Sequence, residues 1–139
     1  MKILKLLRIN NWVKNIFILM PLFFSGQFFD YDKFLDNIIV LIGFSFIASS
    51  VYIINDLFDL KYDKTHPEKK FRPLASGKIS IGFSIKFAIL LVITGHLIIY
   101  MKSLNCMIIS FLYFTINLFY SYKLKQIPII DFVIISIGF

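Results

Sequence analysis

Acidic and amide side chains recur at helical spacing in one short segment, "NDLFDLKYD". If one helix runs through it, Asp56, Asp59 and Asp63 occupy positions i, i+3 and i+7 on a shared face, with Asn55 one turn before Asp59. No Gly or Pro interrupts the segment, so the helix can continue through it. Carboxylates on one stripe repel each other by a few tenths of a kcal/mol per pair. The pattern therefore predicts a cation at this face.

The chemistry of that cation follows from its ligands. Carboxylate and amide oxygens, with no His or Cys among them, favour a hard ion, and Mg²⁺ commonly bridges protein carboxylates to substrate phosphates. The loop that follows is basic, and His66, Lys70 and Arg72 can donate to phosphate oxygens. An acidic face followed by a basic loop predicts a site for Mg²⁺ and a diphosphate.

A second explanation needs no substrate. A loop at a membrane surface is charged because water surrounds it and because basic residues fix topology, and such loops also meet anionic headgroups. This explanation accounts for the lysines of the loop. It does not account for the helical register of the Asn and Asp residues, which serve no topological purpose.

The rest of the chain is apolar. Hydrophobic residues make up 58% of its 139 residues, 17 of them are Phe, and the mean hydropathy is +0.79. This composition lies outside the soluble range and indicates a membrane protein. The single cysteine, Cys106, excludes both an internal disulfide and a thiolate metal site. Pro21 and the lack of a small-residue cleavage site argue against a removable signal peptide.

A membrane-spanning helix needs about 20 apolar residues, and the chain has several stretches of about that length. They are residues 13–29, 37–55, 83–101 and 104–122, and a fifth stretch begins at Ile127. A β-barrel would need alternating polar and apolar residues, which these stretches lack. We expect an all-α polytopic transmembrane bundle with four full spans and the start of a fifth. The fifth, about 20 Å long, would end inside the bilayer, so we expect the front part of a longer protein or the product of a shortened gene.

Basic residues orient this bundle. Most of them fall on one side of the predicted membrane: Lys2, Lys5, Arg8, Lys14, those of the 55–80 loop, Lys123 and Lys125. The opposite connections carry only Lys33 and Lys102. By the positive-inside rule, the N-terminus and the 55–80 loop face the cytoplasm, in a single multi-pass domain of the cell membrane, residues 1–139.

The motifs resemble those of a known family. "NDLFDLKYD" resembles the NDxxDxxxD motif of the UbiA superfamily of intramembrane prenyltransferases, and "RPLASG" is similar to the segment that follows it there. "NNWVKNIFILMPLFFSG" and "DKTHPEKKFRPLASGKIS" look most like the decaprenyl-phosphate phosphoribosyltransferase branch. The resemblance covers essentially the whole chain, although such proteins are longer.

The resemblance implies roles for particular residues. Asn55, Asp56, Asp59 and Asp63 match the motif that holds Mg²⁺ and diphosphate, the three aspartates being catalytic. The substrate-binding positions that match family motifs are Lys14 and Asn15 of "WVKN" and His66, Lys70 and Arg72 of "HPEKKFRP". Tyr122 and Lys123, at a predicted membrane edge, are candidate rim residues, although aromatic anchoring also explains Tyr122. A second acidic motif of the family is absent from this sequence.

The branch implies a reaction. Phosphoribose would pass from phosphoribosyl pyrophosphate, the phosphorylated small-molecule donor, to a polyprenyl phosphate acceptor within the membrane lipid. One alternative is a prenyltransferase that moves a polyprenyl group from its diphosphate to an aromatic or other acceptor. The other is an inactive truncated fragment or a non-catalytic membrane subunit. We expect no nucleic-acid partner, and the oligomeric state stays open.

One further ionisable residue, His96, lies within the third predicted span. An ionisable group at that depth is a candidate functional residue. A neutral imidazole hydrogen-bonded to a neighbouring helix is the alternative that we favour.

Overall fold

A computed structural model describes residues 2–122 of the chain. Its three long helices are α3 (Tyr31–Phe58), α5 (Ile81–Tyr100) and α6 (Leu104–Tyr122). Each is long and apolar enough to cross a membrane. They correspond to the predicted second, third and fourth spans, which confirms the helical membrane fold class. The predicted fifth span, from Ile127, lies outside the described residues.

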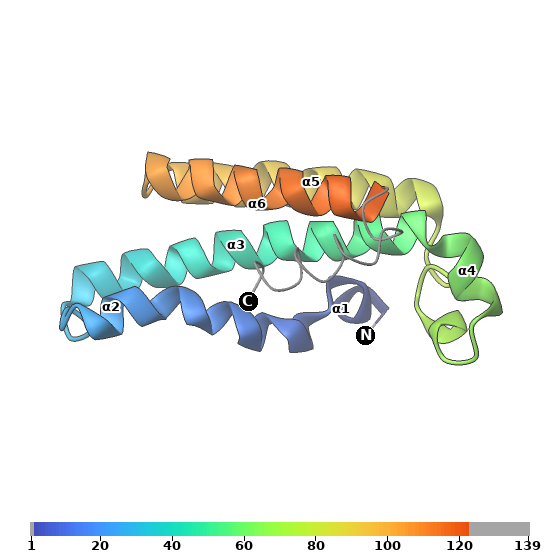
Figure 1. The fold of residues 1–139 in the computed structure, drawn as a ribbon, viewed down its shortest axis with the longest axis horizontal. Coiled ribbons are helices and arrows are strands. Elements are labelled where there is room, and N and C mark those ends of the chain that lie inside the picture. Colours follow the sequence, from blue (N-terminus) through green and yellow to red (C-terminus); the bar gives the residue numbers. More distant parts are fainter. Residues whose placement is uncertain (1, 123–139) are drawn as a thin grey trace.

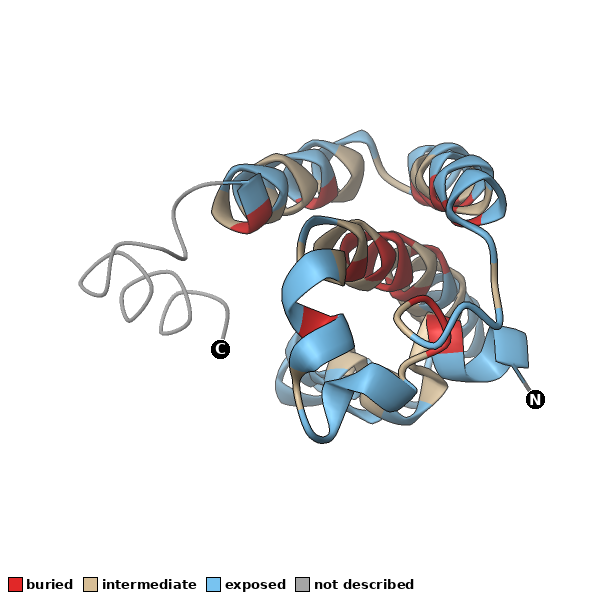
Figure 2. Ribbon diagram, turned by 90° about the vertical axis from the view of Figure 1, so that its right-hand side faces the viewer, coloured by how far each residue is buried: buried red, intermediate tan, exposed pale blue. Residues whose placement is uncertain are grey.

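The central element of the bundle is α3. The helices α5 and α6 pack on one side of it, and the N-terminal segment runs along the other (Figure 1). Buried residues accordingly gather on α3 (Figure 2). The N-terminal segment begins with α1 (Lys2–Leu7), whose Leu6 is buried beside Ile53, Ala88 and Leu91.

Two glycines set the distance between α3 and α5. A Cβ atom at Gly43 would lie 3.0 Å from the carbonyl oxygen of Gly95, and one at Gly95 would lie 2.7 Å from that of Gly43. At such distances neither Gly43 nor Gly95 can carry a side chain unless the two helices move apart. Small residues allow this kind of close backbone approach in membrane bundles, where dispersion replaces the hydrophobic effect as the driving force.

Hydrogen bonds attach the N-terminal segment to the other side of α3. The indole Nε1 of Trp12 donates to Ser49 Oγ at 2.9 Å, and Ser49 Oγ in turn donates to the carbonyl of Leu7 at 2.8 Å. One turn earlier on α3, Asn15 Nδ2 donates to Ser45 Oγ at 2.9 Å. Both serines are fully buried, so these bonds satisfy polar groups that have no access to water.

The first predicted span differs from the observed one in bounds and in helix type. Instead of residues 13–29, the structure has a 3₁₀ helix, η1 (Ile9–Leu19), followed by the short α2 (Met20–Phe24). A 3₁₀ helix rises about 2.0 Å per residue and an α-helix about 1.5 Å, so η1 and α2 together cover about 30 Å. This more extended backbone lets a short segment follow α3 along most of its length (Figure 1).

The close approach of α3 and α5 predicts a contrast between two glycines of the same helix. Gly95→Ala should destabilise the chain by about 1–3 kcal/mol, because the new methyl group would overlap the α3 backbone. Gly82→Ala meets nothing within 4 Å and should be neutral or slightly stabilising. Denaturation in mixed micelles, followed by circular dichroism, measures both. Equal stability of the two variants would contradict the close packing.

Candidate functional site

The acidic segment lies where α3 ends and α4 (Leu60–Thr65) begins. The two helices are separated only by Asp59. Its amide still donates to the carbonyl of Asn55 at 2.9 Å, and its carbonyl accepts from the amide of Asp63 at 2.8 Å. The predicted continuation of the helix through this segment is therefore confirmed, with a single-residue interruption.

Two of the aspartates share one guanidinium group. Asp56 and Asp63 are only 3% and 2% exposed. Arg72 Nη1 lies 3.0 Å from Asp56 Oδ1 and 2.7 Å from Asp63 Oδ2. The predicted cation at this face is, in this structure, an arginine side chain from the following loop.

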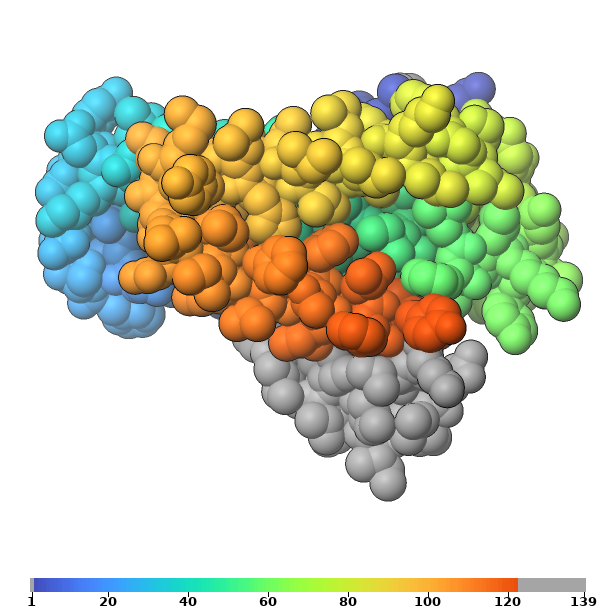
Figure 3. Space-filling view, turned by 90° about the horizontal axis from the view of Figure 1, so that it is seen from above, coloured from blue at the N-terminus to red at the C-terminus, as the bar shows by residue number. Residues whose placement is uncertain are grey.

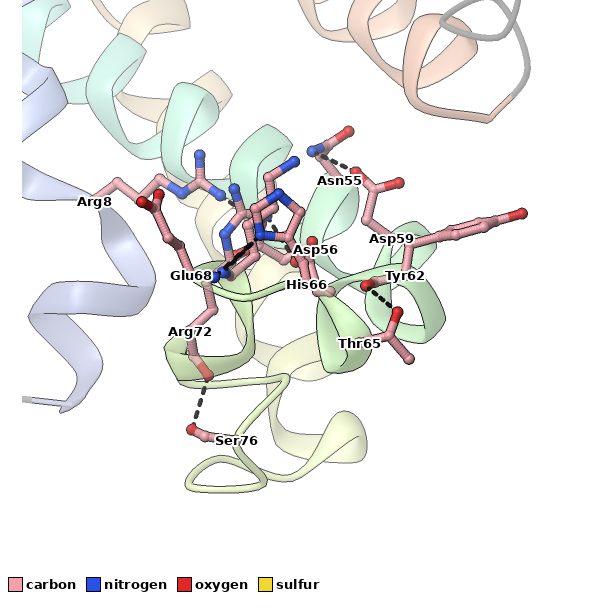
Figure 4. Close-up of polar contacts among 12 residues, drawn as sticks. Arg8, Asn55, Asp56, Asp59, Tyr62, Thr65, His66, Glu68, Arg72 and Ser76 are labelled. Carbon is pink, nitrogen blue, oxygen red and sulfur yellow. Dashed lines mark hydrogen bonds and ion pairs between the residues drawn. The ribbon is translucent and has the colours of Figure 1, made fainter.

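Arg72 is held by its own loop. It follows the 3₁₀ turn η2 (Lys69–Phe71), and its amide donates to the carbonyl of Lys69 at 2.9 Å. Its carbonyl accepts from Ser76 Oγ at 2.8 Å (Figure 4). The loop therefore folds back and brings Arg72 to Asp56 and Asp63, near the helix end at which the loop starts.

A second arginine, Arg8, reaches the same carboxylate from the N-terminal segment. Arg8 Nη2 forms an ion pair and hydrogen bond with Asp56 Oδ1. Its guanidinium lies over the ring of Tyr52, 4.9 Å from the centroid, in cation–π contact. The backbone at Arg8 is left-handed, with φ 51°, and this conformation separates α1 from η1.

In the sequence Arg8 counts only as a topological charge, and its contact with Asp56 is not predicted. The two partners are 48 residues apart, so no local spacing relates them. The available signal was physical: a buried carboxylate needs a positive partner, and Arg8 is the one arginine before the acidic segment.

The other two motif residues form a separate pair. Asn55 Nδ2 donates to Asp59 Oδ2 at 3.2 Å. Figure 4 shows this pair on the opposite side of the cluster from Arg8. Within residues 2–122, no three His, Cys, Asp or Glu residues converge in a way that could hold a metal ion. The oxygen donors suit Mg²⁺ by type, but in this arrangement Asp56 and Asp63 bind guanidinium groups instead.

Two side chains of the basic loop differ in how far they are held in place. His66 Nδ1 accepts from the amides of Glu68 at 3.2 Å and Lys69 at 3.3 Å, which fixes the orientation of the ring. A neutral imidazole that accepts at Nδ1 carries its proton on Nε2. Lys70 is exposed, with its Nζ 5.2 Å from the centroid of the Phe71 ring. The loop thus presents an exposed ammonium group and an oriented imidazole near Arg72.

The remaining predicted site residues lie farther away or outside the described part. Asn15 contacts Ser45, which lies eleven residues before Asp56, about 16 Å along an α-helix. Lys14, its neighbour on η1, is exposed. The ring of Tyr122 packs edge-on against Phe58 at 5.8 Å, which brings the end of α6 to the end of α3. Lys123 lies outside the described residues, and binding roles for all of these residues stay predictions.

Known proteins similar to this chain include transferases. The chain is 32% identical over 142 residues to the decaprenyl-phosphate phosphoribosyltransferase of Corynebacterium glutamicum, covering 98% of this chain and 42% of that protein. It is 32% identical over 130 residues to the uncharacterized protein y4nM of Sinorhizobium fredii, covering 94% of this chain and 25% of that protein. It is also 32% identical over 100 residues to the digeranylgeranylglyceryl phosphate synthase of Sulfurisphaera tokodaii, covering 72% and 35% of the two chains.

The chain spans less than half the length of these curated relatives. Residues 16–139 match the UbiA prenyltransferase family, a range that includes the acidic segment, the basic loop and all three long helices. The resemblance drawn from the motifs is confirmed, and so is the multi-pass helical membrane architecture. The chain belongs to the UbiA prenyltransferase family.

Proposed function

We propose that this chain forms the donor-binding part of a membrane transferase that moves phosphoribose from phosphoribosyl pyrophosphate to a polyprenyl phosphate. The observation that carries the proposal is the convergence of Asp56 and Asp63 with Arg8 and Arg72 at the end of a membrane-spanning helix. Relatives named decaprenyl-phosphate phosphoribosyltransferase support the choice of donor and acceptor.

The proposed reaction exchanges one carbon–oxygen bond for another. The bond between the anomeric carbon of ribose and the diphosphate breaks, and its electron pair leaves with the diphosphate. A phosphate oxygen of the lipid forms the new bond to the same carbon. This oxygen is already ionised near pH 7, because the second pKa of a phosphate monoester is about 6. The acceptor therefore needs no general base, and the main task of the protein is to stabilise charge on the leaving group.

The residues of the site suit that task. The guanidinium groups of Arg8 and Arg72 can donate to the diphosphate oxygens, with Lys70 as an additional point charge from the exposed loop. Asn55, Asp56, Asp59 and Asp63 would supply the oxygen donors that hold Mg²⁺. When bound, Mg²⁺ supplies positive charge against the diphosphate as it departs.

We also propose that the N-terminus and the 55–80 loop face the cytoplasm across the cell membrane. The two lysines at the opposite end of the bundle are both neutralised by ion pairs, Lys33 with Asp30 at 3.4 Å and Lys102 with Asp36 at 2.6 Å. The positive-inside rule counts lysines and arginines and not net charge, and among the described basic residues only these two lie at that end, which supports this orientation.

A second function has its own support. The 32% identity to a digeranylgeranylglyceryl phosphate synthase favours a prenyl diphosphate donor. The acidic segment suits a prenyl diphosphate as well as phosphoribosyl pyrophosphate. An inactive fragment or a non-catalytic subunit is the third alternative, and it predicts no diphosphate binding.

The proposed site predicts a loss of ligand binding on neutralisation. Asp56→Asn or Asp59→Asn should weaken Mg²⁺-dependent binding of phosphoribosyl pyrophosphate at least tenfold, because each removes an anionic oxygen donor. Calorimetric titration of the chain in detergent micelles, with and without Mg²⁺, measures this change. Asp32→Asn, an exposed residue near the other end of α3, is the matched control. Unchanged binding in the Asp56 and Asp59 variants would refute the site.

The identity of the donor can be tested by competition. Phosphoribosyl pyrophosphate should displace a prenyl diphosphate such as geranylgeranyl diphosphate from the chain when both are present with Mg²⁺. Filter binding measures how much radiolabelled prenyl diphosphate stays on the chain as phosphoribosyl pyrophosphate is added. Preferential retention of the prenyl diphosphate would reverse the assignment in favour of prenyl transfer.

The ion pair of Arg8 predicts energetic coupling with Asp56. Arg8→Gln and Asp56→Asn should each destabilise the chain, but the double variant should be less destabilised than their sum, by about 0.5–3 kcal/mol. The reason is that either single change leaves a poorly balanced charge near the buried end of α3. Denaturation of the four proteins completes the cycle. Strict additivity would mean that the pair contributes nothing to stability.

A further inference from the structure

A shallow hollow lies outside the acidic site, at the start of α5. Its volume is about 750 Å³. The described residues that line it come from α1, from the segment before α5 and from the first turn of α5: Lys2, Ile3, Lys78, Ile79, Ser80 and Phe83. In Figure 3 the N-terminal residues, in dark blue, lie along the loop and the start of α5, on the edge of the molecule away from α6.

Positive charge at this hollow is not balanced by the described chain. Lys2 and Lys78 are both exposed, and neither forms an ion pair with a residue of the described range. Lys86 is also exposed on α5, one turn beyond Phe83 and about 8 Å into a membrane-spanning helix. A lysine at that depth extends its ammonium group back toward the headgroups. The lysines would therefore gather at the level of lipid phosphates.

Part of the wall of the hollow is apolar and exposed. Ile3 is 45% exposed and Phe83 is 44% exposed. Residues 78–83 straddle the first residue of α5, so cationic and apolar groups meet at the start of a spanning helix. A soluble phosphate would use the lysines but not the apolar wall. A second copy of this chain in a two-fold contact at this face would place lysines against lysines.

We propose that this hollow binds an anionic phospholipid, with its phosphate against Lys2 and Lys78 and its acyl chains along Ile3 and Phe83. The bound lipid links α1 to the start of α5. Since Leu6 of α1 packs in the core and Arg8 follows directly after α1, the lipid also stabilises the segment that brings Arg8 to Asp56. The site is separate from the proposed transfer reaction and does not depend on it.

Native mass spectrometry of the 139-residue chain, released from detergent micelles, tests the proposal with phosphatidylglycerol and phosphatidylcholine as probes. The parent chain should retain phosphatidylglycerol in preference. Lys2→Gln and Lys78→Gln should each lower its retention about fivefold, and the double variant by about 25-fold, as expected for one basic residue each near a lipid surface. The matched control is Lys61→Gln with Lys64→Gln, two exposed lysines of α4 that do not line the hollow.

Three outcomes would overturn the proposal. Equal retention of the two lipids would show that headgroup charge is not recognised. An equal loss in the control pair would assign the effect to overall charge rather than to the hollow. Displacement of phosphatidylglycerol by an equimolar polyprenyl phosphate would assign the hollow to the acceptor lipid of the proposed reaction instead. The single variants, checked by circular dichroism, keep the test decisive if the double variant fails to fold.

Discussion

The carboxylates of Asp56 in α3 and Asp63 in α4 are buried where the two helices meet, and the rest of the structure depends on how they are neutralised. A buried carboxylate without a partner costs several kcal/mol, so positive groups must be supplied from elsewhere in the chain. Arg72 supplies one from the loop after α4, and Arg8 supplies the other from the segment before η1. The acidic segment, the loop that follows it and an arginine 48 residues before Asp56 are thereby joined at one point.

The ion pairs at that junction can form only if the neighbouring elements pack closely against α3. The contact between Gly43 and Gly95 brings α5 against α3. On the other face, Trp12 and Ser49 hold η1 along the same helix. These contacts are short-range and demand small or polar partners at defined positions. The hydrogen bond of Trp12 with Ser49 fixes the N-terminal segment beside the helix whose end carries the acidic residues, and so brings Arg8 within reach of Asp56.

Sequence reasoning recovered what depends on local spacing and missed what depends on distant partners. The absence of Gly and Pro allowed a helix through residues 55–63, on which the spacing of the aspartates placed them on one face, and the apolar stretches predicted α3, α5 and α6. The sequence did not predict that the motif separates into two pairs, Asp56 with Asp63 and Asn55 with Asp59. The arginines decide this separation, because they bind the first pair and leave the second to itself. Nor did the sequence predict the 3₁₀ conformation of η1, since apolar content indicates a span but not the rise of its backbone.

The pairing of arginines with aspartates also bears on how a diphosphate and a metal would bind. Under the proposed function, Arg8 and Arg72 turn to the phosphate oxygens, and Asp56 loses the positive partners that it has here. A diphosphate alone would leave that buried carboxylate unbalanced, and a divalent cation alone would leave the guanidinium groups facing added positive charge. Only both together preserve the balance of charge at the end of α3. The same ion pairs that stabilise the chain therefore couple the two ligands, so that each is expected to bind more tightly in the presence of the other.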